Sequence, residues 1–330
     1  MRISILGAGA WGTALAINLT ARHEVRLWAR DAAQVAVMQA DRSNQRYLPN
    51  LTFPAALQIT TDFYEACRSA ELILIAVPIA ALRETLQQIV GVAARAPVVW
   101  VCKGFEANTA QLPHQVVAEV FPPDHLVGVL SGPSFAQEVA RGLPTALTLA
   151  ASDGGFAKRI AQALHHSHLR IYSSTDVIGV EVGGAVKNVL AIAAGIAEGL
   201  GLGYNARAAL ITRGLAEITR LGLMMGGRAE TLGGLSGAGD LILTCTGQLS
   251  RNRQVGMLLA KQHALPDILQ ELGHVAEGVY TVREVQQLAR QLKINMPICA
   301  AVYSVLYGQI SAAQALEDLL SRAPSAEFEE

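Results

Sequence analysis

Short apolar runs alternate with helical patterns along the first half of the chain. The run LILIAV at residues 72–77 is apolar on both faces, which is typical of a strand buried between two layers of helices in a parallel sheet. Similar runs lie at residues 2–6, 25–28, 98–102, 126–130 and 146–150. Helical spacing between them, as at residues 11–22, 80–90 and 111–120, predicts βαβ units.

The second half of the chain has a different pattern. Long helical patterns follow one another at residues 180–200, 206–221, 251–261, 279–291 and 300–307. We therefore predict a boundary near residue 180, between an α/β domain (residues 1–180) and an all-helical domain (residues 181–330). The longest charge-free stretch, residues 294–316, contains Asn295, Pro297 and Gly308, which favours a buried helix with a break near Gly308 over a membrane span.

The composition of the chain indicates which class of molecule it binds. The chain has 330 residues, of which 51% are hydrophobic and 16% charged, and its net charge is −1. Such a chain can bury sizeable cores, and it lacks the basic field that attracts nucleic acid. We therefore expect small-molecule partners, with any anion bound by a few placed cations.

The cysteines and the N-terminal sequence indicate the cellular compartment of the protein and whether it binds a metal ion through cysteine. Cys67, Cys102, Cys245 and Cys299 form no C-x-x-C pair and no zinc spacing, so we expect reduced thiols and no metal. The N-terminal sequence MRISILGAGAWG lacks the pattern of a secretory signal. Both features favour a cytoplasmic protein.

A glycine-rich motif, GAGAWG, follows the first apolar run and opens the first helix. This G-x-G-x-x-G string in this context predicts a dinucleotide-binding Rossmann fold. Gly7 permits the tight turn, Gly9 lets a pyrophosphate approach the backbone, and Gly12 lets helix and strand pack closely. The helix N-terminus supplies N–H groups for the phosphates. A plain glycine-rich turn is the alternative.

The end of the second apolar run bears on the choice of dinucleotide. Arg30 stands about where an acid would bind the ribose 2′-hydroxyl, and a guanidinium there suits the 2′-phosphate of NADP. The neighbouring Asp31 could bind the 2′-hydroxyl of NAD, so NAD remains an alternative. The pattern is equally consistent with Arg30 being a surface arginine that binds no cofactor.

Two segments at strand ends are candidates for ligand contact. Lys103 ends the run VVWVCK, at the carboxyl edge of the sheet where such folds bind ligands. Ser131, Gly132 and Ser134 follow the next run and form either a ligand-binding turn or an ordinary loop. A lysine that merely extends to solvent is common at such a position.

Lys187 is the most informative charged residue. It lies in the middle of a helix that is apolar on nearly every face, where a lysine is costly unless it is paired or used. Burial lowers a lysine pKa, which suits proton transfer at a carbonyl oxygen. Asp240, a lone carboxylate between glycines and apolar residues, could orient or pair with it; a purely structural ion pair is the alternative.

The sequence SRNR opens another helix. Ser250 is a good N-cap, and Arg251 and Asn252 then lie in the first turn. A helix N-terminus with an arginine favours a phosphate site. An ordinary capped surface helix would have the same sequence features.

Taken together, these motifs resemble one family, the bacterial NAD(P)-dependent glycerol-3-phosphate dehydrogenases. The resemblance runs from about residue 3 to about residue 320 and includes GAGAWGTALA, VCKG, SGPSFAQEVA, GGAVKN, NARAALITRGLAE, GAGDLILTCT, SRNR and VAEG. It implies a Rossmann domain followed by a helical domain of the 6-phosphogluconate-dehydrogenase-like type. It also implies reduction of dihydroxyacetone phosphate to sn-glycerol 3-phosphate for glycerophospholipid synthesis, and a possible homodimer.

The resemblance also implies roles for individual residues. Lys187 would exchange the proton at the substrate oxygen, with Lys103 and Asp240 beside it. The substrate would be bound by Lys103, Gly132, Ser134, Lys187, Asn188, Asp240, Ser250, Arg251 and Asn252. The cofactor, NADP or NAD, would be lined by Gly7, Gly9, Ala10, Trp11, Gly12, Arg30, Lys103, Ala136, Arg251, Val275 and Glu277. Ala10 replaces a serine found in many relatives, and some relatives have histidine at position 30, so the cofactor preference does not transfer.

Three other interpretations remain open at this stage. A reductase of another keto acid would keep the glycine motif and the buried lysine but would lack the SRNR phosphate site. A non-catalytic NAD(P)-sensing protein would need no ionisable group buried in the second domain. A helical scaffold protein would have no use for the glycine motif.

Overall fold

The computed structural model describes residues 1–93, 95–273, 276–308 and 310–322. Their first part forms one sheet, in the order β10-β9-β8-β7-β6-β1-β2-β5. The strands are β1 (Arg2–Leu6), β2 (Glu24–Trp28), β5 (Gln58–Thr60), β6 (Leu72–Ile75), β7 (Val98–Trp100), β8 (Val127–Ser131), β9 (Thr145–Ala150) and β10 (Leu169–Ser174). Among these described strands, every neighbouring pair is parallel except β8 and β9. The predicted Rossmann, doubly wound and mostly parallel sheet is confirmed.

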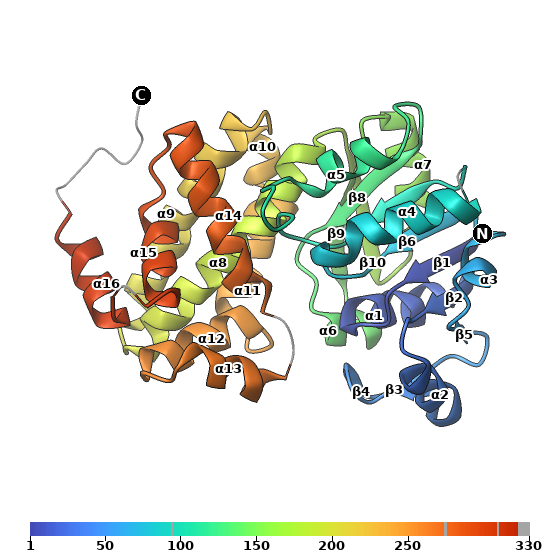
Figure 1. The fold of residues 1–330 in the computed structure, drawn as a ribbon, viewed down its shortest axis with the longest axis horizontal. Helices are drawn as coiled ribbons and strands as arrows, with labels where there is room; N and C mark the ends of the chain where they lie inside the picture. The colour runs from blue at the N-terminus through green and yellow to red at the C-terminus, as the bar shows by residue number, and fades with distance from the viewer. Residues whose placement is uncertain (94, 274–275, 309, 323–330) are drawn as a thin grey trace.

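Both faces of the sheet are buried, as the apolar runs predict. Leu72 and Leu74 of β6 belong to one hydrophobic cluster, whereas the alternate residues Ile73 and Ile75 belong to another. Helices cover these two faces (Figure 1). They are α1 (Ala10–Leu19), α2 (Ala32–Asp41), α3 (Phe63–Cys67), α4 (Leu82–Ala93), α5 (Pro113–Val120), α6 (Ala136–Ala140) and α7 (Gly154–Leu164), with a 3-10 turn at Ile79–Ala81.

Several strands of the structure were not predicted from apolar runs. β5, β10 and the small β3 (Ser43–Asn44) and β4 (Leu48–Thr52) ladder are short or polar, so they lack a continuous apolar signal. β10 lies at the edge of the sheet, where alternate residues face solvent. The antiparallel direction of β9 was also not predicted, because a strand buried on both faces has the same apolar pattern in either direction.

The second part of the chain is helical. It comprises α8 (Val177–Gly199), α9 (Gly203–Met224), α10 (Ala229–Leu232), a π-helical turn (Leu235–Gly239), α11 (Asp240–Thr246), α12 (Arg251–Ala260), α13 (Leu265–Leu272), α14 (Glu277–Leu292), α15 (Pro297–Leu306) and α16 (Ala312–Leu320). Gly308, with φ +75°, lies between α15 and α16, so the predicted break near this residue is confirmed.

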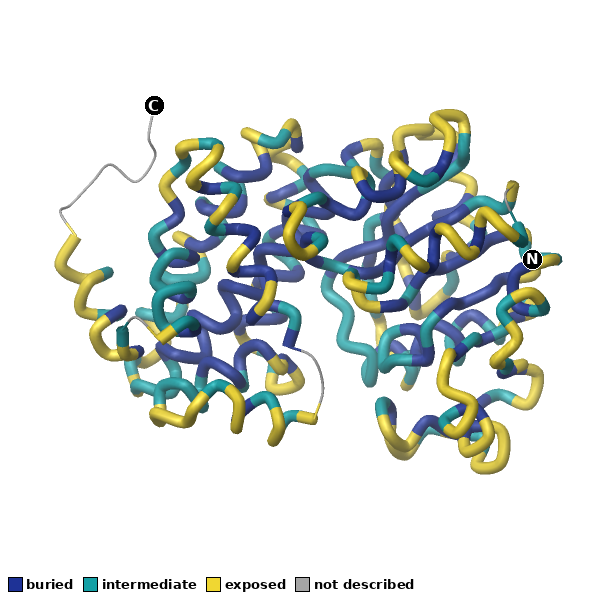
Figure 2. Tube along the Cα trace, viewed as in Figure 1, coloured by how far each residue is buried: buried dark blue, intermediate teal, exposed yellow. Residues whose placement is uncertain are grey.

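Helix α8 is the centre of the helical part. Helices α9, α11, α12 and α14 pack around it, and Figure 2 shows buried backbone through this region and through the sheet. Its closest contact is with α12: a Cβ on Gly195 would lie 2.0 Å from the carbonyl oxygen of Arg253, and a Cβ on Gly256 would lie 2.0 Å from that of Ile192. Within the described residues, α8 is the one helix whose length and composition would suit a membrane span, and most of it is buried inside the protein.

Candidate active site

The glycine motif forms a tight strand-to-helix turn at the carboxyl end of β1. Gly7 has φ +116°, and a Cβ there would lie 2.7 Å from the carbonyl oxygen of Ala76. A Cβ on Gly12 would lie 1.9 Å from the carbonyl oxygen of Gly7, so the helix starts directly against the turn. Gly9 is the N-cap of α1, and a Cβ there would meet nothing within 4 Å. The first turn of α1 therefore offers unpaired N–H groups to open space, which fits a dinucleotide pyrophosphate.

Other residues expected to line the cofactor lie beside this turn. Ala10 and Trp11 begin α1 and are half-buried. Trp11 packs in one apolar cluster with Ala136, the first residue of α6. Val275 lies outside the described residues.

Arg30 is exposed just beyond the end of β2. The neighbouring Asp31 is the N-cap of α2, and its carboxylate accepts hydrogen bonds from the backbone N–H groups of Ala33 (3.0 Å) and Gln34 (3.2 Å). The carboxylate at this edge is therefore engaged in a helix cap, whereas the guanidinium of Arg30 reaches solvent.

Three charged side chains converge where the sheet meets the helical part. Lys187 Nζ donates to Asp240 Oδ1 at 2.5 Å, and Lys103 Nζ donates to Asp240 Oδ2 at 2.6 Å. The Asp240 side chain is 1% exposed, and that of Lys187 is 9% exposed. Lys103 follows β7, Lys187 is in the middle of α8, and Asp240 is the first residue of α11. One buried carboxylate thus binds two lysines from different parts of the fold.

The pKa of Lys187 is lowered to about 8: burial is the main cause, the Asp240 carboxylate opposes it, and the nearby Lys103 charge adds to the lowering. Thr244, one turn after Asp240, also accepts a hydrogen bond from Lys187 Nζ at 3.0 Å. Lys187 can therefore gain and lose a proton near neutral pH, as general acid–base chemistry requires. No sequence motif singled out Thr244; its position four residues after Asp240 on a helix was the available signal.

The turn after β8 meets the same cluster. The Gly132 carbonyl accepts hydrogen bonds from Lys103 Nζ (3.3 Å) and from the Ser134 hydroxyl (2.9 Å). Gly132 has φ +136°, a conformation that favours glycine. The structure therefore joins Lys103, Gly132 and Ser134, each of which the resemblance assigns to substrate binding, in one hydrogen-bonded group.

A chain of amide and carboxylate groups links α8, α12 and α14. Asn252 Nδ2 donates to Asn188 Oδ1 at 3.0 Å, and Asn188 Nδ2 donates to Glu277 Oε2 at 3.3 Å. Asn252 Oδ1 accepts from the backbone N–H of Gly278 at 3.0 Å. Burial raises the pKa of Glu277, and the positive charges of Arg251 and the two site lysines oppose that shift.

The two arginines of SRNR have different surroundings. Ser250 is the N-cap of α12, as predicted, and its hydroxyl accepts from the backbone N–H of Arg253 at 3.3 Å. Arg253 is buried and donates to both carboxylate oxygens of Glu198, at 2.7 and 2.5 Å. Arg251 is exposed at the helix N-terminus. The sequence alone could not tell these two arginines apart, since both lie in the first turn.

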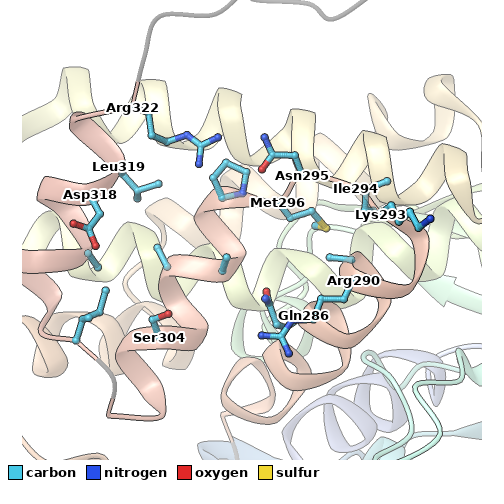
Figure 3. A pocket seen from close by; sticks show the side chains of 16 residues that line it. Gln286, Arg290, Lys293, Ile294, Asn295, Met296, Ser304, Asp318, Leu319 and Arg322 are labelled. Carbon is cyan, nitrogen blue, oxygen red and sulfur yellow. The ribbon is translucent and has the colours of Figure 1, made fainter.

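A cavity of about 490 Å³ lies elsewhere, among α14, α15 and α16 (Figure 3). Arg290, Lys293 and Arg322 line it, together with Asn295 and Asp318. Its lining includes none of the described candidate residues. Among the residues that the structure describes, no group of three or more His, Cys, Asp or Glu side chains could hold a metal ion.

Comparisons with known proteins identify the relatives of this chain. Two family models match it: the NAD-dependent glycerol-3-phosphate dehydrogenase N-terminus over residues 2–157, and the corresponding C-terminus over residues 176–317. The chain is 61% identical over 327 residues to a glycerol-3-phosphate dehydrogenase [NAD(P)+] of Nitrosomonas eutropha, covering 99% of both chains. It is 56% identical over 328 residues to that of Dechloromonas aromatica, covering 99% of this chain and all of the relative. The crystal structure of glycerol-3-phosphate dehydrogenase from Coxiella burnetii has a TM-score of 0.93 at 43% identity, covering 97% of this chain and 99% of that one.

Proposed function

The chain belongs to the family of NAD-dependent glycerol-3-phosphate dehydrogenases, and we propose that Lys187 exchanges the proton in its reaction. It is an oxidoreductase that reduces dihydroxyacetone phosphate reversibly to sn-glycerol 3-phosphate with NAD(P)H. The observation that carries the proposed role is the pair of hydrogen bonds from Lys187 and Lys103 to the buried Asp240.

The glycine turn and its neighbours hold the dinucleotide. The first turn of α1 would meet the pyrophosphate, because Gly9 leaves the approach open. Trp11 and Ala136 line the same edge, and the exposed Arg30 would hold the ribose end of the dinucleotide, where its charge would suit a 2′-phosphate. When bound, the reduced nicotinamide supplies the hydride for the ketone carbon of the substrate.

The lysine pair acts on the substrate oxygen. As the carbonyl carbon gains the hydride, the C=O π electrons move onto oxygen, and the Lys187 ammonium donates one proton to the resulting alkoxide. The charges of Lys187 and Lys103 stabilise the negative charge before the proton moves. Asp240 orients both ammonium groups. In the oxidation direction, neutral Lys187 removes the hydroxyl proton.

The substrate phosphate is held by the N-terminus of α12. Arg251 is exposed there beside the N-cap Ser250, so its guanidinium and the first N–H groups of the helix can meet the same anion. Asn188 and Asn252, hydrogen-bonded to each other, present polar groups to the substrate next to Lys187. Gly132 and Ser134 complete the pocket on the side of the sheet.

The two parts of the chain divide this work. Residues 1–180 hold the dinucleotide, and residues 181–330 supply the proton and the phosphate site, with Lys103 reaching from the first part to the second. We further propose that the enzyme acts in the cytoplasm and as a homodimer. Its four cysteines are free and buried, which suits a reducing compartment.

The test is the oxidation of NADH and NADPH, followed by nicotinamide absorbance, with dihydroxyacetone phosphate and with unphosphorylated dihydroxyacetone. We expect rapid oxidation only with the phosphate ester, and almost none from the Lys187→Ala variant. Equal rates with both substrates would contradict the phosphate site at α12. A Lys187→Ala enzyme with unchanged kcat would contradict the proton-transfer role. The NADPH-to-NADH ratio measures the part played by Arg30.

A further inference from the structure

Helix α8 carries a second buried charged group, Glu181, that the reaction as described above does not use. Its side chain is 1% exposed and lies less than two helical turns before Lys187. Glu181 Oε1 accepts hydrogen bonds from Trp100 Nε1 at 2.8 Å and from the backbone N–H of His114 at 2.9 Å. Oε2 is hydrogen-bonded to His114 Nδ1. Both partners belong to the sheet part of the chain.

These partners flank the segment that carries Lys103. Trp100 is the last residue of β7, and His114 is the second residue of α5, so residues 101–112 form the connection between them. One carboxylate on α8 therefore holds both ends of this connection.

The connection contacts the same helix through Lys103, its third residue. A Cβ on Gly184, one turn after Glu181, would lie 3.5 Å from Cγ and Cδ of Lys103. Lys103, Glu181 and Gly184 line one small space at this junction. The stem of Lys103 thus runs directly along the helix that carries Lys187.

We propose that Glu181 is a positioning residue of the reaction: by holding Trp100 and His114, it fixes the connection that brings Lys103 to Asp240. This inference rests on the proposed function, because it assigns Glu181 a role only through Lys103. Lys103 Nζ lies 2.6 Å from Asp240 Oδ2, a contact that a small movement of the connection would break. A displacement of about 1 Å in a reacting group can reduce a rate about 100-fold.

The chemistry of the site supports positioning over simple packing. Burial raises the pKa of Glu181, and the contacts with His114 and Trp100 oppose that rise. A leucine of similar volume would fill the space without the cost of desolvating a carboxylate. The contacts that Glu181 makes instead all go to the two ends of one connection, and that connection carries a site lysine.

The experiment compares two substitutions at Glu181 with a matched control on α9. Glu181→Gln keeps one oxygen that can accept the hydrogen bonds from Trp100 Nε1 and the His114 backbone N–H, whereas Glu181→Leu removes every acceptor. Glu217 is also buried and also accepts backbone N–H groups, from Ile298 and Cys299, so Glu217→Leu removes a comparable buried acceptor at the start of α15. Each variant is measured for melting temperature, and for kcat and KM with dihydroxyacetone phosphate.

We expect Glu181→Leu to lower kcat/KM about 100-fold and Glu181→Gln to stay close to the unsubstituted enzyme. Glu217→Leu should lower the melting temperature but leave kcat/KM within about twofold, since its helix end is not part of the site. Equal kinetic losses at Glu181 and Glu217 would overturn the proposal. If neither leucine variant folds, Trp100→Phe removes one of the two Oε1 hydrogen bonds, and unchanged kinetics there would overturn it as well.

A double substitution separates positioning from a general structural effect. If Glu181 acts through Lys103, Glu181→Leu should lower kcat/KM by less than about twofold in a Lys103→Ala background. Losses that multiply would reject the link. A Lys103→Ala enzyme with full activity would instead reject the proposed function of Lys103. An inactive Lys103→Ala enzyme beside a fully active Glu181→Leu enzyme would overturn the present inference alone.

Discussion

Replacing Asp240 with asparagine tests the electrostatics of the site most directly. The carboxylate accepts hydrogen bonds from Lys187 Nζ at 2.5 Å and from Lys103 Nζ at 2.6 Å, and it is almost fully buried. Asparagine keeps the size of the side chain but removes its charge. The two ammonium groups would then lie close together without a counter-charge.

The direction of the effect follows from the groups that surround Lys187. Its pKa of about 8 is set mainly by burial, which lowers it, and by the Asp240 charge, which opposes that change, so removing the charge must lower the pKa further. An opposite charge at this distance typically changes an ionisation constant about 10- to 1000-fold. With a pKa of about 8, Lys187 would be about half protonated near pH 8 in the unsubstituted enzyme. In Asp240→Asn, the protonated fraction at that pH would fall about fivefold to about 500-fold.

Ketone reduction needs protonated Lys187, so its kcat/KM should decline as the pH rises through the pKa of the free enzyme. The pH at which kcat/KM is half-maximal should therefore move down in Asp240→Asn. For glycerol 3-phosphate oxidation, which needs neutral Lys187, the rise of kcat/KM with pH should begin at a lower pH than in the unsubstituted enzyme. Both profiles can be followed by nicotinamide absorbance from about pH 6 to about pH 10.

The matched control is Asp176→Asn, at the N-cap of the same helix. Asp176 is buried and accepts hydrogen bonds from the backbone N–H groups of Gly179 and Arg228, both at 2.9 Å. Its substitution should change stability without moving either pH profile. The electrostatic account is refuted if Asp240→Asn retains the midpoint of the unsubstituted enzyme or shifts it upward.

Three further predictions concern the phosphate site, the glycine turn and the buried arginine. Arg251→Ala should raise the KM for dihydroxyacetone phosphate about 10-fold to 100-fold, which is the effect of losing one charge-assisted hydrogen bond. Arg30→Ala should instead raise the KM for NADPH and leave that for NADH unchanged, and equal effects of the two variants on substrate and dinucleotide would contradict the assignment. Gly12→Ala should destabilise the fold by at least about 1–3 kcal/mol because its Cβ would overlap a backbone carbonyl, whereas Gly9→Ala should keep the melting temperature and weaken dinucleotide binding in a titration. Arg253→Met should lower the free energy of unfolding by about 1.5–3 kcal/mol, measured by denaturant titration, because it removes the hydrogen bonds of a buried guanidinium to Glu198, a half-buried carboxylate that keeps its ion pair with Arg207; a loss below about 0.5 kcal/mol is the opposing result.

Much of the fold could be predicted because buried strands and buried helices have strong apolar patterns. The runs at β1, β6 and β7 and the long apolar stretch of α8 were of this kind. β5 and β10 could not be predicted in this way, because they are short or alternate with exposed residues at an edge. Strand direction also leaves no trace in such a pattern, as β9 demonstrates.

The site could be predicted where a charged residue occurs in an otherwise apolar or glycine-rich segment. A lysine in the middle of an apolar helix and a lone aspartate between glycines suggested the Lys187–Asp240 pair. That Lys103 binds the second oxygen of the same carboxylate could not be predicted, since 137 residues separate the two and only the fold brings them together. The pairing of Arg253 with Glu198 depends in the same way on how closely α8 and α12 pack.

The central position of α8 has a consequence for the order in which the protein is made. The helix is apolar enough by composition to resemble a membrane segment, and it leaves the ribosome before α9, α11, α12 and α14, which cover it. Until those helices are synthesised, nascent α8 would expose its apolar surface to the ribosome exit, to chaperones and to membrane-targeting factors. Chains interrupted between α8 and α14 should therefore be the forms of this protein most prone to aggregation or mistargeting.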